Sequence, residues 1–281
     1  MNINEIPSGI KSGLEKIDFS QIHRDFSQTK YGNILSQNIR WARYKPENMT
    51  NEKWVKLLGA DANNLEHLKL TYGTTRAFIK YSSKETPLTT EEQEDLLLAA
   101  TVHDWGEAII GDINYDLKTP QDEIRELEEL EKMVKEMYGE KNSQLSSRVD
   151  TVINNIINGH NTKLGKMFNA IERIGYLRTA LHVWKKTTGE ISTELKRNLD
   201  WISCNVLLGS LTQLMEYSKT YPPVALYLKE NKEIITDIFN NLPEESFLKY
   251  DPKEVEQKKQ KFNTVRQAWQ EYYLNLTKDT K

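Results

Sequence analysis

The sequence is poor in cysteine, proline and glycine. Among 281 residues there are one cysteine, eight prolines and 13 glycines. The single thiol, Cys204, cannot form a disulfide within the chain, so a reducing compartment such as the cytoplasm is the simplest setting. Its apolar surroundings favour a buried, inert thiol over a nucleophile. In few segments do apolar and polar residues alternate with period two. Few glycines or prolines interrupt the helical spacing of apolar residues. The sequence therefore predicts an all-α fold.

Long apolar runs and an excess of one charge are also missing. No run of 18 apolar residues occurs, so we expect no membrane-spanning helix and a cytoplasmic protein. Lysine and arginine total 38 and aspartate and glutamate total 41, for a net charge of −3. No overall basic field attracts nucleic acid, and we expect no nucleic-acid partner. A chain of this length buries roughly three quarters of its unfolded surface, which is enough for a core without disulfides.

The helical periodicity indicates one domain preceded by an arm. Residues 1–28 are polar and mixed in character, and we expect an irregular N-terminal arm there. Residues 29–281 are predicted to form a single all-α domain, a helical bundle. No repeat and no low-complexity tract divides it. The region 191–240 carries many large apolar side chains, most of which we assign to the core, and a homodimer seam is compatible with the same pattern.

Three helix starts are recognisable. Asn63 and Glu66 have the spacing of a capping box, so a helix should begin there. Acidic residues after Thr90 begin another helix, which we expect to continue as far as Gly111 and to lie inside the bundle. Thr119-Pro120 opens a charged helix, most of which should face water.

The segment from His103 to Asp112, HDWGEAIIGD, concentrates polar residues at the end of this apolar helix. His103, Asp104 and Glu107 are three or four positions apart, so they can line one side of a helix. An ionised aspartate in buried surroundings is costly unless a cation or hydrogen bonds compensate. Imidazole with carboxylate suits a borderline divalent cation. The residues alone leave two interpretations open, a metal site and a buried polar cluster satisfied by backbone and arginine.

The sequence has His67 on one expected helix and the pair His103-Asp104 on the next. This arrangement in an all-α chain resembles the HD-domain metal-dependent phosphohydrolases. The longer string is similar to the 5′-deoxynucleotidase branch, in which a glutamate and then Gly-Asp follow the histidine-aspartate pair. Glu107, Gly111 and Asp112 match those places. The resemblance covers about residues 30–190. Residues 44–62 look like an insertion, and the C-terminal helices, as far as residue 281, lie outside the family-like core.

The resemblance implies a role for each matching residue. The metal ligands are His67, His103, Asp104 and a later acidic residue, Glu172. Glu107 and Asp112 are the catalytic residues, and Arg40, Trp41 and Lys118 contact the nucleotide. Glu172 departs from the family, which has aspartate there. Glu172 is interpreted either as a ligand with a longer arm or as the partner of Arg173 or Arg178 in an ion pair.

The remaining histidines, His23, His160 and His182, are predicted to be surface or packed side chains. None lies between His67 and His103, which argues against a two-iron centre of the kind that oxygenases on this fold use. The resemblance therefore implies one divalent ion, with Co, Mn, Zn, Fe and Mg as candidates. The implied activity is release of phosphate from deoxynucleoside 5′-monophosphates. Two alternatives remain: hydrolysis of nucleoside di- or triphosphates, and a non-catalytic nucleotide-binding regulatory module.

Overall fold

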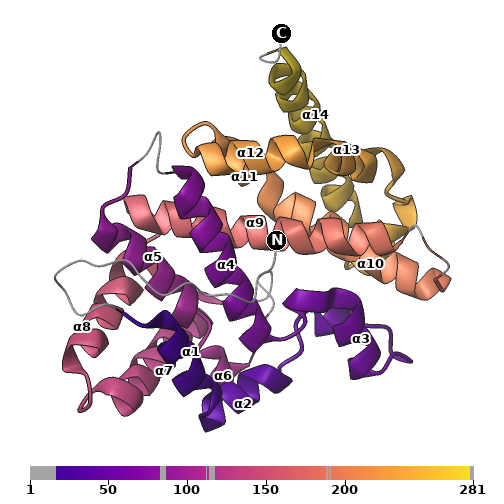
Figure 1. The fold of residues 1–281 in the computed structure, drawn as a ribbon. Helices are drawn as coiled ribbons and strands as arrows, with labels where there is room; N and C mark the ends of the chain where they lie inside the picture. Colours follow the sequence, from indigo (N-terminus) through magenta and orange to yellow (C-terminus); the bar gives the residue numbers. More distant parts are fainter. Residues whose placement is uncertain are drawn as a thin grey trace. The chain divides into compact units, whose positions relative to one another are not determined.

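The structure is a computed structural model, and it describes residues 17–82, 87–111, 113, 118–187, 189 and 191–278. Of residues 276–278 only the backbone is described. The described residues form an all-α helical bundle (Figure 1). They contain no strand, and the one β-type pairing among them is an isolated antiparallel bridge between Ile39 and Asn63. The predicted fold class is therefore confirmed.

The chain divides into two compact units. The first comprises Met1–Arg40 and Ala60–Ile171, and the second comprises Trp41–Gly59 and Glu172–Lys281. Each unit is thus built from two separate stretches of sequence. The sequence predicted one domain over residues 29–281, and whether the two units fold as one domain stays a prediction.

The first unit contains most of the helices that precede residue 172. They are α1 (Phe19–Ser27), α2 (Lys30–Gln37), α4 (Asn64–Ser82), α5 (Thr90–Val102), α6 (Glu107–Ile110), α7 (Pro120–Tyr138) and α8 (Ser143–Val152), followed by the π-helical turn η3 (Ile153–Ile157). Helix α5 contacts α1, α4 and α8, which makes it the central helix of this unit. Leu96, Leu98 and Ala99 on α5 are fully buried, as expected for a helix that is apolar on nearly every side.

Helix α1 corrects the predicted irregular arm over its last residues. Asp18 caps this helix by accepting a hydrogen bond from the backbone N–H of Gln21 at 3.0 Å. Ile22 and Phe26, one turn apart, are buried, and Phe26 stacks on Trp105 with ring centroids 4.1 Å apart. The apolar spacing of Ile22 and Phe26 was too short a signal within a polar stretch to predict a helix. Residues 1–16 lie outside the described residues.

The second unit contains the remaining elements. They are η1 (Ala42–Tyr44), α3 (Asn51–Leu58), α10 (Thr193–Val206), the π-helical turn η4 (Leu207–Leu211), α11 (Thr212–Ser218), α12 (Pro222–Glu230), α13 (Lys232–Asn241), η5 (Glu244–Lys249) and α14 (Val255–Lys278). Two further elements contain unit boundaries: η2 (Gly59–Asp61) and the long helix α9 (Lys163–Lys186). The early segment of this unit packs on later helices, since Tyr44 lies 4.5 Å from Trp201 between ring centroids.

Candidate metal centre

The histidine-aspartate pair lies on a tight turn, whereas the sequence predicted one continuous helix. Helix α5 ends at Val102, and α6 begins at Glu107. Between them Trp105 N–H donates to the Val102 carbonyl at 3.0 Å, and Glu107 N–H donates to the Asp104 carbonyl at 3.1 Å. These bonds span three residues instead of four, so the chain winds more tightly here. The predicted end at Gly111 is confirmed, because Gly111 ends α6 with a φ of 83°.

Tertiary packing accounts for this turn. A Cβ at Gly106 would overlap the backbone carbonyl oxygen of Glu126 and lie 2.8 Å from its Cγ, so only glycine fits against α7 at this point. Trp105 next to it is 1% exposed and stacks on Phe26. The turn is therefore packed between α1 and α7. This packing outweighs the local preference of the sequence for a continuous helix.

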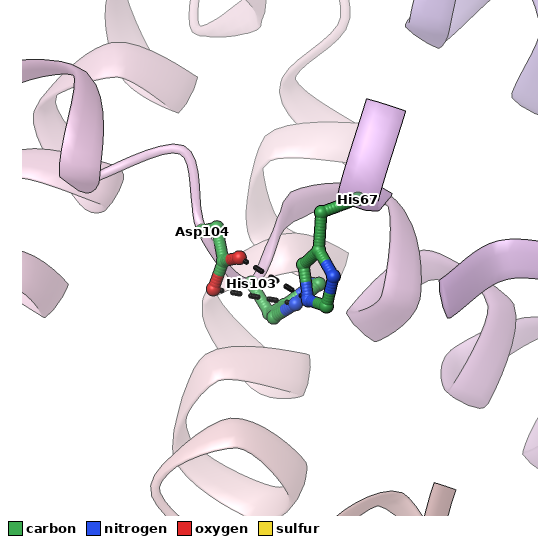
Figure 2. A group of neighbouring side chains, drawn as sticks. All are labelled: His67, His103 and Asp104. Atoms are coloured by element: carbon green, nitrogen blue, oxygen red, sulfur yellow. Dashed lines mark ion pairs between the residues drawn. The ribbon is translucent and has the colours of Figure 1, made fainter. Parts of the chain in front are cut away.

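The turn brings together three of the four predicted metal ligands. Nε2 of His103 lies 3.3 Å from Oδ1 of Asp104, and Nε2 of His67 lies 3.6 Å from Oδ2 of the same carboxylate (Figure 2). His67 comes from the first turn of α4, and the two imidazole centroids are 5.5 Å apart. All three side chains are buried, with residue exposures of 3–9%.

The donor atoms of the three side chains lie close enough together to hold one metal ion after small adjustments. Donor atoms that each lie about 2.1 Å from one ion are about 3.0–3.4 Å apart at the usual angles. The ligand atoms of His67, His103 and Asp104 all lie within 4.8 Å of one another, with the two histidine–aspartate distances given above. Oδ2 of Asp104 is buried and accepts no hydrogen bond from the described residues. The set therefore fits one borderline divalent cation, which suits mixed imidazole and carboxylate donors.

Asp61 orients His67. Its Oδ1 lies 2.8 Å from Nδ1 of the imidazole, and since a carboxylate only accepts, the proton is on Nδ1. When the ring is neutral, Nε2 is then its lone-pair nitrogen, and it lies toward Asp104 and 3.3 Å from Oγ1 of Thr71. Metal-binding histidines commonly have such a carboxylate behind them. Sequence reasoning missed Asp61, for which the signal was an acid shortly before the cap of the histidine-bearing helix.

Arg40 reaches the same group through the β-bridge. The N–H of Arg40 donates to the Ala62 carbonyl at 3.1 Å, and the N–H of Asn64 donates to the Asn38 carbonyl at 3.2 Å. This pairing ties the segment after α2 to the start of α4. The guanidinium then lies 3.1 Å from Asp61 and 3.6 Å from Asp104.

The charges around Asp104 favour its ionised form. Burial by itself raises the pKa of this carboxyl, but the imidazoles of His103 and His67 and the guanidinium of Arg40 outweigh burial. The pKa of Asp104 therefore lies well below its usual range. An ionised carboxylate is the form that binds a metal ion.

Glu107 lies at the first position of α6 and is 6% exposed. The side-chain amide of the fully buried Asn64 donates a hydrogen bond to Oε2 of Glu107. The amide of Asn38 donates to the backbone carbonyl of Glu107 at 3.4 Å. Asn64 was predicted only as part of a helix start, and its contact with Glu107 is a further feature that the sequence did not reveal.

Glu126 is a second acidic residue that sequence reasoning missed. Its carboxylate, with those of Asp104 and Glu107, forms a second group whose oxygens lie within 4.8 Å of one another. Lys118 forms an ion pair with Glu126. Burial raises the pKa of the Glu126 carboxyl to about 7, although the Lys118 ammonium lowers it. Burial lowers the pKa of Lys118, but Glu126, Glu107 and Asp104 outweigh burial and raise it, so the ammonium stays charged.

Three predicted site residues are not part of this group as the structure describes it. Trp41 and Glu172 belong to the second unit. Trp41 has a left-handed backbone with φ of 60°, and its ring contacts Tyr44 and Tyr176 at centroid distances of 5.8 and 6.2 Å. Glu172 is half-buried in α9. The parts of Trp41 in nucleotide binding and of Glu172 in metal binding stay predictions, and Asp112 lies outside the described residues.

A cavity of about 940 Å³ opens at another place in the first unit, lined by residues of α1, α5, α7 and α8. It contains none of the predicted site residues, so cavity size does not point to the metal centre.

No helix in the described part of the chain is long and apolar enough to cross a membrane. No protein-family model, curated protein or solved structure matches this chain.

Proposed function

We propose that the chain is a metal-dependent phosphohydrolase of the HD-domain type that releases phosphate from deoxynucleoside 5′-monophosphates in the cytoplasm. The observation that carries the proposal is the buried group of His67, His103 and Asp104 with Glu107 beside it. Two imidazoles and one carboxylate converge there, and a second carboxylate lies within 4.8 Å of Asp104. Ligands next to a separate acid or base are what metal-assisted hydrolysis needs.

In this proposal His67, His103 and Asp104 hold one divalent ion, and Glu172 completes the set. When bound, such an ion supplies Lewis-acid polarisation of the phosphoryl group and lowers the pKa of a coordinated water. Glu107 either takes a proton from the attacking water as a general base or gives one to the leaving oxygen as a general acid. The amide of Asn64 holds one oxygen of Glu107 in place, so that the carboxylate is already oriented when substrate arrives.

The cationic groups serve the phosphate. Arg40 and Lys118 neutralise its negative charge, Arg40 with a planar guanidinium that suits phosphate oxygens. Trp41 forms a wall for the sugar and excludes a 2′-hydroxyl, and Asp112 lies near the sugar or the leaving group. The support for Arg40 is its position beside Asp104, and the support for Lys118 is its position beside Glu126 in the same unit.

The deciding experiment is a panel of nucleoside mono-, di- and triphosphates, each with Mn²⁺, Co²⁺, Mg²⁺ and Zn²⁺, assayed for phosphate, pyrophosphate and tripolyphosphate release. We expect release of phosphate from deoxynucleoside monophosphates. Glu107→Gln should keep bound metal and lose on the order of a hundredfold in turnover, as removal of a general acid or base does. Release of pyrophosphate or tripolyphosphate alone would favour the di- or triphosphate hydrolase. Nucleotide binding without any hydrolysis would favour the regulatory module.

A further inference from the structure

Glu126 occupies an unusual position on its helix. Helix α7 carries many acidic side chains, and most of them face water, as the sequence predicted. Glu126 instead shares the buried stripe of the helix with Leu130, Met133 and Val134 and is 6% exposed. A carboxylate at such a position is destabilising unless a cation pairs with it.

The backbone fixes where this carboxylate lies. Because Gly106 has no side chain, α7 approaches the turn that carries Asp104 so closely that a Cβ at Gly106 would overlap the Glu126 carbonyl. The Glu126 carboxylate consequently lies with those of Asp104 and Glu107 in one group. Its position therefore follows from main-chain packing within one unit.

The cation that pairs with Glu126 is Lys118. The side chain of Lys118 is 19% exposed and that of Glu126 is 8% exposed, so water screens this ion pair only weakly. Lysine has a long flexible stem, and ordering that stem at the moment of ligand binding lowers affinity. An ammonium that Glu126 already holds beside Asp104 and Glu107 avoids most of that loss.

We propose that Glu126 is a positioning residue that holds the Lys118 ammonium toward the metal centre and thereby sets the affinity of the centre for a phosphate group. The inference rests on the proposed function, because it deepens the role given to Lys118. Glu126 itself touches no substrate. Its effect on phosphate passes entirely through Lys118.

The test is a double-mutant cycle on binding of inorganic phosphate in the presence of Mg²⁺, measured by calorimetry. Wild type is compared with Glu126→Gln, Lys118→Ala and the double variant. We expect each single variant to weaken phosphate binding about tenfold and the double variant to be no weaker than Lys118→Ala. Glu128→Gln, an exposed acid on the same helix, is the matched control and should bind as wild type does.

Two outcomes overturn the inference: phosphate affinity of Glu126→Gln within twofold of wild type, or losses that simply add in the double variant. Thermal melting of the same proteins gives a second measure of the pair. Lys118→Ala should lower the melting temperature by leaving a buried carboxylate without its cation, and the added Glu126→Gln should restore part of the loss. If the phosphate cycle behaves as expected while no nucleotide is hydrolysed, the proposed function fails and the positioning role stands.

Discussion

Asp61 and His67 form a pair in which one oxygen of the carboxylate lies 2.8 Å from Nδ1 of the imidazole. The contact decides which ring nitrogen is protonated, and so which one is available to a metal ion. The same oxygen lies 3.1 Å from Nε of Arg40. Asp61 thus organises a metal-ligand candidate and a cation of the site at once.

Asp61→Asn should weaken metal binding without removing a ligand. An asparagine lacks the negative charge that makes the imidazole a stronger donor, and loss of such a partner typically costs 10–100-fold in affinity. Titration with Mn²⁺ measures the change. Glu123→Gln, an exposed acid in the same unit, is the control. Equal Mn²⁺ affinity in wild type and Asp61→Asn would contradict this role of the Asp61 charge.

His103→Ala and Asp104→Ala should each abolish bound metal, because each removes a ligand outright. Elemental analysis of the purified proteins gives metal content per chain. His160→Ala replaces an exposed histidine away from the group and should keep wild-type metal content. Unchanged metal in both site variants would refute the metal centre.

Glu172 tests the departure from the family pattern. If Glu172 is a ligand, Glu172→Ala should lose metal as Asp104→Ala does, and Glu172→Asp should retain only part of the affinity because its arm is one methylene shorter. If Glu172 instead pairs with Arg173 or Arg178, Glu172→Ala should keep the metal and lower the free energy of unfolding by up to about 3 kcal/mol. Metal titration together with melting separates the two results.

Sequence patterns predicted the local features of this site and missed those that depend on packing. The Asn63 cap is confirmed, since its Oδ1 accepts from Glu66 N–H at 2.9 Å. The Thr119 cap with Pro120 is confirmed as well. The break after Val102 could not be predicted, because it depends on how closely α7 approaches Gly106. Glu126 was not singled out for the same reason: it belongs to a charged helix of which most was predicted to face water, and its burial comes from a turn distant in sequence.

Gly106→Ala should destabilise the fold, because the added methyl group overlaps the backbone of α7 and cannot move aside. Overpacking of this kind costs about 1–3 kcal/mol, or more where the backbone cannot shift. Gly175→Ala is the matched helical control, since a Cβ there meets nothing within 4 Å. That variant should gain up to about 1 kcal/mol from helix propensity. Denaturant unfolding of both proteins measures the contrast, and equal stabilities would contradict the close approach.

His23 should make stability depend on pH. Burial, and then the charge of Lys69, lower the pKa of His23 from 6.5 to about 4, and no described residue hydrogen-bonds its Nε2. The unfolded chain therefore takes up a proton before the folded one as pH falls. The stabilisation is complete above pH of about 6.5 and is lost as pH falls toward about 4, by about 3 kcal/mol in total.

The measurement for His23 is denaturant unfolding at several pH values between 7.5 and 4.5. His23→Phe keeps an aromatic ring against Tyr72 and removes the titrating group. We expect the difference in unfolding free energy between wild type and His23→Phe to change with pH in the direction above. A difference that stays constant across this range would contradict a lowered pKa of His23 in the folded state.

The interleaving of the two compact units has a consequence for how the protein is made. Residues 41–59 leave the ribosome early, yet the partners of Tyr44 include Trp201 and Asn205. The backbone carbonyl oxygen of Leu57 likewise lies 3.0 Å from Nε2 of His182, a residue made much later. During synthesis these contacts cannot form until more than a hundred further residues have been added to the chain. The nascent chain is therefore most exposed to chaperones and to misassembly in the interval before α10 emerges.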